Sequence, residues 1–350
     1  MMMIVALHYM NKSIGGGLNT ELPINVITSH IIESICITSV NVFVLISGYY
    51  MQGVRTTGLR KAIDLYLVML FYHVPSFIIA VLTGQSEFTL KNLVYAVAPF
   101  LLGIRWFLET YIILLLIAPF LNVLLNNINK KQHILLISIQ FLLFSIWPSF
   151  LPSAPITDGG YGITNFITLY VIAGYMRRYI SFSDARKTRR LMWILFAASC
   201  AAITVSSFVP YLRGRAWDYC YIFNIVASVS LFTAFLNLPR TDSGFVNTVA
   251  STTFGVYISH TVLYFQPLVY KTLLQTDRFL NSPLQPLHCI VSVLILFTAC
   301  SALDMLRQKL WKVTVDKWLR NSKILKEEAE WEASITTPES NEYFGIKPHP

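Results

Sequence analysis

The sequence predicts an all-α protein, a polytopic membrane bundle of helices, and two observations support this fold class. First, only 13% of the residues are charged and 55% are hydrophobic, whereas a soluble domain carries about 25% charged residues. Second, the apolar residues occur in long blocks, and a helix needs about 20 of them to cross a bilayer. The net charge of +9 resides between these blocks, so we expect a lipid bilayer, and no nucleic acid, as partner.

The apolar blocks predict about ten spanning helices. We place them near residues 1–11, 34–51, 62–83, 107–125, 134–151, 162–179, 191–210, 218–237, 247–270 and 286–306. The first block supports only about 16 Å of helix against a hydrocarbon core of about 30 Å, which predicts a truncated first span. Residues 93–104 are apolar but too few to cross, which favours an interfacial or re-entrant helix. We expect one transmembrane domain over residues 1–310 and a polar cytoplasmic tail over residues 311–350.

The distribution of basic residues predicts the orientation of the bundle. Alternate loops and the tail are basic, and they hold Arg55, Arg60, Lys61, Lys130, Lys131, Arg177, Arg178, Arg186, Lys187, Arg189, Arg190 and the lysines and arginines after position 306. The intervening loops are nearly balanced in charge. The positive-inside rule then predicts that both termini lie in the cytoplasm of a multi-pass protein of the plasma (inner) membrane.

Several polar groups have an ordinary structural interpretation. The 5 cysteines lack metal-ligand spacing, so we expect small buried hydrophobic side chains and no metal site. We interpret Glu33 and Asp304 as residues at span ends, in the headgroup layer. Asp64 lies one helical turn after Arg60 and Lys61, so we expect a local ion pair there.

His8 is the polar residue that is hardest to explain by packing alone. It closes the first apolar block and is followed by Tyr9, Asn11 and a glycine-rich loop. An ionisable group at this depth is costly in a membrane, which makes it a candidate for function. A neutral imidazole can take a proton from a hydroxyl group and return it later, so His8 is suited to act as a general base.

Three further segments carry candidate residues. Ser47 and the following glycine end the second span, where small residues also allow close helix packing. In the segment GIRWFLETY, Arg105 and Trp106 suit either an outer aromatic belt with a snorkelling arginine or contact with a sugar. His260 lies mid-span, which favours a polar network or a functional role. We expect His8, Ser47, Trp106 and His260 to line one polar cavity, because buried polar groups need partners.

Taken together, these segments resemble the membrane acyltransferase family 3, bacterial integral-membrane enzymes that acylate surface carbohydrates. The matching pieces are IVALHY, FVLISGYYM, WFLETYIILLLIAPFLN and TFGVYISH, in this order, and the resemblance covers most of the chain. Two features depart from the family's pattern. Its arginine at the cytoplasmic start of the first span would precede Met1, and its arginine pair before the third span is matched only in part by Arg60 and Lys61.

The resemblance implies an integral-membrane O-acyltransferase, which we interpret as an O-acetyltransferase. It would move an acyl group from cytoplasmic acyl-CoA (acetyl-CoA), a donor substrate rather than a bound cofactor, to a hydroxyl of a cell-surface polysaccharide or lipid-linked glycan. The residues that we assign are His8, Ser47 and His260 as catalytic, Arg105, Trp106 and Glu109 as the acceptor cavity, and Arg60 and Lys61 as the site for the donor phosphates.

The alternative is a membrane transporter or flippase of a polar or lipid-linked solute. Such proteins often contain inverted repeats with interrupted helices at matching positions, and the sequence shows no such halves. A membrane scaffold would need neither His8 nor the basic 52–61 loop. The pattern of residues therefore favours an enzyme.

Overall fold

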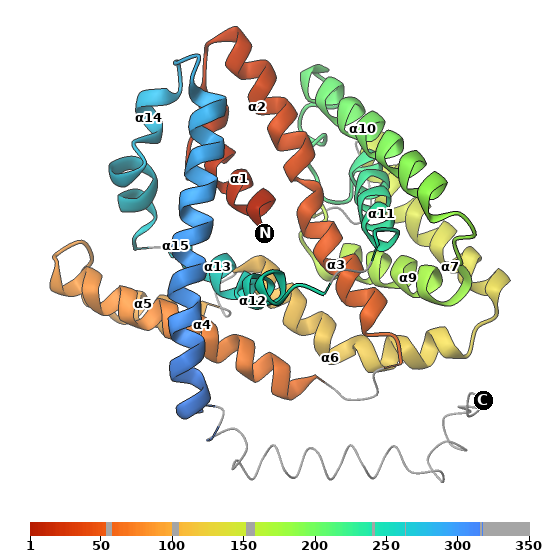
Figure 1. Cartoon of the computed structure of the whole chain (residues 1–350), viewed down its shortest axis with the longest axis horizontal. Coiled ribbons are helices and arrows are strands. Elements are labelled where there is room, and N and C mark those ends of the chain that lie inside the picture. The colour runs from red at the N-terminus through yellow and green to blue at the C-terminus, as the bar shows by residue number, and fades with distance from the viewer. Residues whose placement is uncertain are drawn as a thin grey trace.

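The computed structural model describes residues 1–53, 58–99, 105–151, 158–239, 242–262, 264–315 and 317, and every regular element in these ranges is helical. The α-helices are α1 (Met2–Met10), α2 (Pro23–Cys36), α3 (Thr38–Tyr50), α4 (Leu59–Leu82), α5 (Leu90–Val97), α6 (Trp106–Asn126), α7 (Lys130–Phe141), α8 (Trp147–Phe150), α9 (Ile163–Tyr179), α10 (Ala185–Phe208), α11 (Ile222–Leu236), α12 (Gly244–Ser251), α13 (Thr253–Ser259), α14 (Thr276–Phe279) and α15 (Gln285–Val313). A 3₁₀ turn, η1 (Gly17–Asn19), and two π-helical segments, η3 (Leu142–Ile146) and η4 (Leu268–Leu273), complete the elements. Figure 1 shows one bundle with the short α1 enclosed near its middle.

The prediction of a polytopic helical membrane protein is confirmed. Within the described ranges, 6 helical stretches are long and apolar enough to cross a membrane. They are Pro23–Tyr50, Leu59–Leu82, Trp106–Asn126, Lys130–Phe150, Ala185–Phe208 and Gln285–Val313. The other expected spans are shorter: α1 has 9 residues, α9 has 17 and α11 has 15. Residues 90–97 form the short helix α5, which has 8 residues, and positions 100–104 of the segment predicted to be interfacial or re-entrant lie outside the described residues.

The second span differs from its prediction because it begins at Pro23 rather than near residue 34. Helices α2 and α3 follow one another with a break at Ile37. At this break the hydroxyls of Thr38 and Ser39 donate to the carbonyl oxygens of Ile35 and Cys36, at 2.8 and 2.7 Å. Such side-chain bonds to the preceding turn compete with the helical ladder and bend a helix. Residues 23–33 are more polar than residues 34–51, so the apolar pattern of the sequence did not reveal the first half of this helical stretch.

The expected span over residues 247–270 is wrong as a continuous helix. It is divided into α12, α13 and η4, and the first break falls at Thr252. The Thr252 hydroxyl donates to the carbonyl oxygen of Val249 at 2.8 Å and lies 3.2 Å from the Ser301 hydroxyl of α15. Because α13 then ends at Ser259, His260 lies at a helix end inside the bundle, where it is only 2% exposed.

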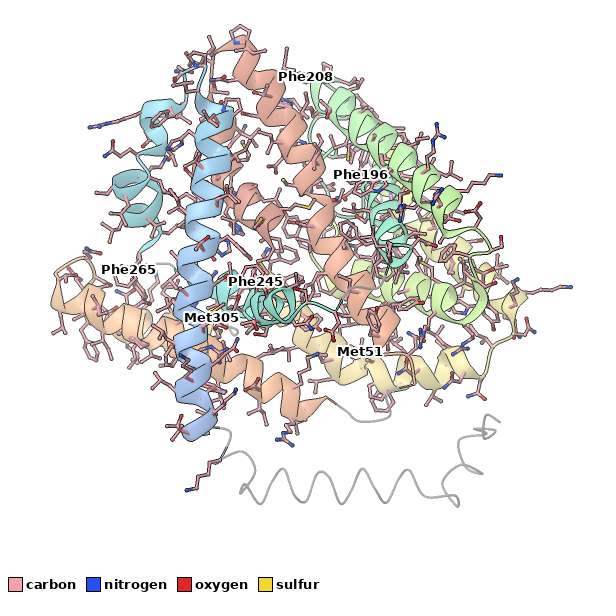
Figure 2. All side chains as sticks on the ribbon, viewed as in Figure 1. Met51, Phe196, Phe208, Phe245, Phe265 and Met305 are labelled. Carbon is pink, nitrogen blue, oxygen red and sulfur yellow. The ribbon has the colours of Figure 1, made fainter. Side chains whose placement is uncertain are left out.

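Exposed apolar side chains cover the perimeter of the bundle, as expected for helices that face lipid. Phe208 on α10 is an example, and Figure 2 shows it near the edge of the view. All 5 cysteines are free and buried, which confirms their interpretation as small hydrophobic side chains.

The helix ends that adjoin the basic loops lie together at one end of the bundle. The indole N–H of Trp311, near the end of α15, donates to the Asp64 carboxylate at the start of α4 at 2.9 Å. The Asn122 amide, near the end of α6, donates to the carbonyl oxygen of Met51 after α3 at 2.8 Å. In Figure 1 these ends occupy the lower part of the bundle. The prediction of an ion pair at Asp64 is wrong. Its carboxylate accepts a hydrogen bond from Trp311 and forms no ion pair with Arg60 or Lys61 in the described structure.

A buried ion pair within α15 is also bonded to α4 through Tyr72. Asp304 is fully buried, and its carboxylate accepts bonds from Arg307 at 2.6 Å, from the Tyr72 hydroxyl of α4 at 2.8 Å and from Gln308 at 2.8 Å. Asp304 lies within the stretch Gln285–Val313 and Glu33 within Pro23–Tyr50, so the prediction that both are span-end residues is wrong. Glu33 is also buried, at 9% exposure. Asp304 is tolerated because each carboxylate oxygen has donors, the condition for burying a charge.

We expect Gly255→Ala to destabilise the fold markedly. A Cβ atom at Gly255 would lie 1.8 Å from an oxygen of the Asp304 carboxylate, and this carboxylate cannot move without losing its donors. Overpacking of this kind typically costs about 1–3 kcal/mol, occasionally more. A thermal unfolding midpoint measured in detergent should fall by several degrees. Gly244→Ala is the matched control, since nothing lies within 4 Å of its Cβ position. An unchanged midpoint for Gly255→Ala would contradict this description of the contact.

Candidate active site

His8 and His260 form a pair inside the bundle, which confirms the expectation that they lie together. The Nδ1 atom of His8, on α1, is 3.1 Å from the Nε2 atom of His260, at the end of α13. Their rings meet edge to face with centroids 4.8 Å apart. His8 is partly exposed, whereas His260 is buried. His8 is therefore the more exposed member of the pair.

The hydrogen bonds of the pair define which nitrogen of His8 is free. His260 Nδ1 lies 2.6 Å from the carbonyl oxygen of Val256, which can only accept, so this nitrogen carries the proton. The Nε2 atom of neutral His260 must then accept, and His8 Nδ1 must donate. His8 Nδ1 also lies 2.9 Å from the carbonyl oxygen of Ile4. The proton on His8 is thus assigned to Nδ1, which leaves the lone pair on Nε2, the tautomer that a general base requires.

Arg105 lies beside the histidine pair and is buried at 7% exposure. Its guanidinium donates to His73 Nε2 at 3.1 Å, to the Thr261 hydroxyl at 2.7 Å and to the Thr261 carbonyl oxygen at 2.6 Å. Thr261 directly follows His260, so the guanidinium is held at the residue next to the histidine pair. In a snorkelling arginine the charged group reaches water. Here it points into the bundle, so the belt interpretation of Arg105 is wrong.

The positive charge of Arg105 has no carboxylate partner among the described residues, where the ion pairs are Lys271–Asp277 and Arg307–Asp304. Glu109, one turn later, accepts a 3.0 Å bond from the backbone N–H of Arg105 rather than from its guanidinium. Glu109 thereby caps the start of α6, where a negative charge complements the helix dipole. Glu109 therefore holds the backbone at Arg105, and none of the described contacts joins Glu109 to the histidine pair.

Trp106 belongs to a cluster of three aromatic rings, defined by Trp106, Tyr161 and Tyr219. Ring centroids are 4.5 Å apart for Trp106 and Tyr161, 5.2 Å for Trp106 and Tyr219, and 4.9 Å for the two tyrosines. Trp106 is half-buried and Tyr161 is exposed. The cluster therefore presents aromatic faces next to Arg105, the residue that precedes Trp106.

The loop that carries Tyr219 is tied closely to the rest of the bundle. The backbone N–H of Tyr219 donates to the carbonyl oxygen of Gly159 at 2.7 Å, and the Asn41 amide of α3 donates to the Tyr219 carbonyl oxygen at 2.8 Å. Gly160 has a φ angle of +79°, and a Cβ atom there would lie 2.4 Å from the backbone nitrogen of Cys220. Only glycine permits this close approach, so the aromatic cluster rests on a rigid loop contact.

Ser47 does not join the histidine pair. Its hydroxyl lies 3.0 Å from the Phe43 carbonyl oxygen and 3.0 Å from the Tyr111 hydroxyl of α6. Among the described ring contacts, a chain of aromatic side chains connects it to α13: Tyr111 stacks on Phe107, and Phe107 meets Tyr257 edge to face. Gly48 approaches α9, where a Cβ atom would lie 3.0 Å from Ala173. The Ser47-Gly48 pair therefore lies at a close helix crossing, and its catalytic role stays a prediction.

Arg60 and Lys61 lie exposed in the first turn of α4. Neither forms an ion pair in the described structure. Arg55, on the same basic loop, lies outside the described residues. The helix α4 connects this exposed pair to His73, which bonds to Arg105, over about 20 Å at 1.5 Å per residue.

Sequence reasoning missed three participants in the site: Thr261, Tyr161 and Tyr219. His73 also belongs to the site, because it is 1% exposed and accepts a hydrogen bond from Arg105. The mid-span position of His73 on α4 was a usable signal. The tyrosines lie in loops, where only the tertiary contacts with Trp106 reveal them. Within the described ranges, no group of three or more His, Cys, Asp or Glu side chains is arranged to hold a metal ion.

The bundle and its buried histidine pair define a polytopic membrane protein with a polar site inside its helices. The family model "Acyltransferase domain", of acyltransferase family 3, matches residues 1–303. The chain therefore belongs to this family and is an integral-membrane acyltransferase, a transferase of groups other than amino-acyl groups. No curated protein and no solved structure matches the chain. The match favours the enzyme over the transporter alternative.

We expect Asp218→Asn to flatten the pH dependence of stability. Asp218 lies in the loop beside Tyr219, outside the spanning helices, and burial raises the pKa of its carboxyl to about 6, with the nearby Asp158 adding to the effect. Between about pH 4 and 6 the folded protein holds a proton that the unfolded chain has lost, so wild-type stability falls as pH rises through this window. Because an asparagine side chain does not titrate, the Asp218→Asn variant does not lose stability through this group as the pH rises.

The measurement is the thermal unfolding midpoint at several pH values from 4 to 7. The Asp242→Asn variant, which changes an exposed carboxylate, should keep the wild-type slope. If Asp218→Asn also kept that slope, the buried carboxyl of Asp218 would not be its source.

Proposed function

We propose that the protein is an O-acetyltransferase, which transfers an acetyl group from cytoplasmic acetyl-CoA to a hydroxyl of a cell-surface polysaccharide or lipid-linked glycan. The observation that carries this proposal is the histidine pair beside an arginine without a carboxylate partner. We place both termini in the cytoplasm of the plasma (inner) membrane, because the basic loops cluster at one end of the bundle and basic loops are retained inside.

In the proposed reaction, His8 Nε2 removes the proton of the acceptor hydroxyl while the hydroxyl oxygen attacks the thioester carbonyl carbon. His260 accepts the Nδ1–H of His8 and so keeps its lone pair on Nε2. The carbonyl oxygen becomes an oxyanion, and the guanidinium of Arg105 supplies the positive charge that stabilises it. When the carbon–sulfur bond breaks, the CoA thiolate takes the proton from His8, so the enzyme returns to its starting state.

The aromatic cluster supports a carbohydrate acceptor. Flat aromatic rings offer apolar faces to the C–H surfaces of a sugar, and a tyrosine adds a polar tip that can bond to a hydroxyl. Trp106, Tyr161 and Tyr219 lie close together, and Trp106 directly follows Arg105 in the chain. In the proposed reaction the glycan acceptor binds at this cluster, and the donor comes from the cytoplasmic side.

Arg60 and Lys61 are suited to bind the phosphates of the donor. Both are exposed and without an ion pair at the end of the bundle that carries the basic loops. A guanidinium presents a fork of donors that matches phosphate oxygens, and lysine adds a point charge. The pantetheine arm of CoA is long and linear, and it would cover the distance along α4 towards Arg105.

We expect His8→Gln to lower the turnover number by about 10²–10⁴-fold, the usual contribution of general-base catalysis. The assay is transfer of radiolabelled acetyl groups to glycan by the purified protein in proteoliposomes. His133→Gln is the control, since His133 is also buried but bonds to Val171 on α9, away from the pair. His260→Gln should lower turnover with little change in KM. Retention of wild-type turnover by a folded His8→Gln protein would remove His8 from the mechanism.

We expect the double change Arg60→Gln and Lys61→Gln to weaken acetyl-CoA binding by about 10-fold or more, as lost charge-assisted hydrogen bonds imply. The dissociation constant for CoA, measured by calorimetry in detergent, checks this. The matched control is Lys130→Gln with Lys131→Gln, a second exposed basic pair in the first turn of a helix, α7. Equal affinity of the two double variants for CoA would show that Arg60 and Lys61 are not the donor site.

A further inference from the structure

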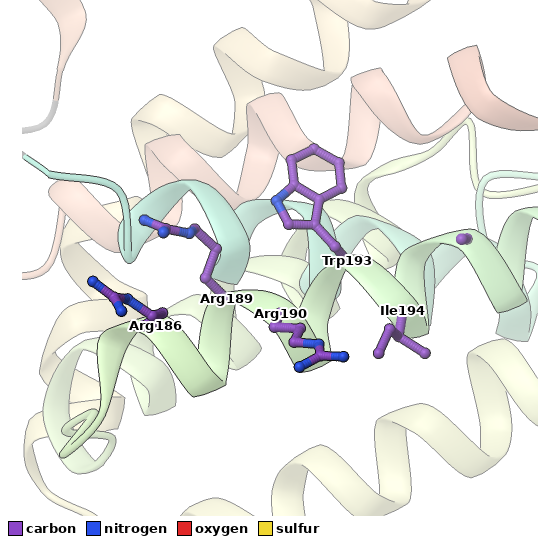
Figure 3. A pocket seen from close by; sticks show the side chains of 6 residues that line it. Arg186, Arg189, Arg190, Trp193 and Ile194 are labelled. Carbon is purple, nitrogen blue, oxygen red and sulfur yellow. The ribbon is translucent and has the colours of Figure 1, made fainter.

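The start of α10 carries a basic hollow that the acyl-transfer reaction does not use. Its volume is about 590 Å³, and it is lined by Arg186, Arg189, Arg190, Trp193, Ile194 and Ala197. Figure 3 shows the three arginines and the indole ring arranged along this helix. Positions 186, 190, 193 and 197 recur every three or four residues, which places them on one face of the helix. The hollow is therefore a feature of this helix face.

The three arginines of this hollow keep their charge available for a ligand. Arg186 and Arg190 are exposed, and none of the three is in an ion pair in the described structure. Arg189 donates only a long bond, 3.4 Å, to the Asn237 carbonyl oxygen at the end of α11. Three guanidinium groups around one hollow favour an anionic ligand, and guanidinium matches phosphate in particular.

The same face of α10 continues as an apolar track. We define the track as the exposed residues Ile194, Ala197, Ala201 and Val205. Alanine in its middle leaves the track shallow, and the helix rises by about 17 Å from its first residue to its last. One leaflet of the hydrocarbon core is about 15 Å thick, half of about 30 Å. A fatty acyl chain can therefore lie along the track while its headgroup occupies the hollow.

The opposite face of α10 is already occupied. Cys200 and Ile203 are buried in a cluster with Tyr221, and Ser207 lies 2.7 Å from His30 of α2. The hollow and the track therefore face outwards, away from the histidine pair. A CoA molecule seated there would have its thioester on the wrong side of α10. Trp193, 41% exposed, is a residue typical of the membrane–water interface, which places the hollow at headgroup depth.

We propose that the hollow at the start of α10 binds the phosphate headgroup of an anionic phospholipid, whose acyl chain lies along the track. The ligand is thus identified by three features of one helix face: unpaired arginines, an interfacial tryptophan and a shallow apolar surface of matching length. Basic sites at the cytoplasmic side of membrane helices attract anionic lipids, with each basic residue adding to affinity. This proposal does not depend on the proposed acyl transfer.

The experiment is native mass spectrometry of the delipidated full-length protein with added phosphatidylglycerol or phosphatidylcholine of the same chain length. The wild type should bind phosphatidylglycerol at least about 10-fold more tightly than the triple variant Arg186→Gln, Arg189→Gln and Arg190→Gln does. A matched control removes three exposed lysines, by Lys131→Gln, Lys187→Gln and Lys309→Gln, and should bind like the wild type. Equal loss of binding in both triple variants would overturn the proposal, since general surface charge would then explain the effect.

A second variant separates a lipid from a soluble phosphate. Ala201→Trp fills the track without changing charge, so it should weaken binding of phosphatidylglycerol and leave binding of glycerol phosphate unchanged. If glycerol phosphate bound to the wild type as tightly as the lipid, or if Ala201→Trp had no effect on the lipid, the site would not be a lipid site. Because acetyl transfer is not the readout, this test can fail while the proposed function stands, and the reverse also holds.

Discussion

The Arg105 guanidinium, buried and bonded to uncharged partners, holds together the segments that make the candidate active site. Its bonds to His73 and Thr261 join the start of α6 to the middle of α4 and to the end of α13. A charge in this position is costly unless its donors are satisfied. The requirement fixes where α13 ends, and so where His260 meets His8. Loss of the guanidinium would leave buried acceptors unpaired and release the histidine pair from its support.

The breaks in the helices also help to bring His260 and Thr261 to the candidate active site. If residues 247–270 formed one continuous helix, its polar groups would be spread along a straight axis and would not gather at one point. Instead, the break at Thr252 and the end of α13 at Ser259 bring a histidine and a free backbone carbonyl to the middle of the bundle. Backbone that is not helical is tolerated at this depth only where protein or water satisfies it, and here the Arg105 side chain does so for Thr261.

Asp304 and Arg105 are both buried, and they illustrate opposite outcomes of burying a charged group. Asp304 has Arg307, Tyr72 and Gln308 as donors, so its charge is compensated and the site is structural. Arg105 has neutral partners in the described part of the chain, so no carboxylate compensates its charge there, and our proposed mechanism uses this charge. The spacing of residues in the sequence could suggest the ion pair of Asp304, because Asp304 and Arg307 lie three residues apart on one helix. It could not suggest the contacts of Arg105, because His73, Arg105 and Thr261 are far apart in the chain.

The sequence by itself determined the membrane class and most of the long helices, and it singled out His8, Arg105 and His260 as candidates, because apolar length and polar residues within apolar blocks are local properties. It misplaced the start of the second span, the continuity of the ninth and the surroundings of Asp64, Asp304 and Ser47. Only the tertiary structure decided that His8 faces His260, that Ser47 faces Tyr111, and that Trp106 meets two loop tyrosines. The reason is that these contacts join residues distant in sequence, and hydrogen-bond satisfaction between helices selects them rather than any local pattern.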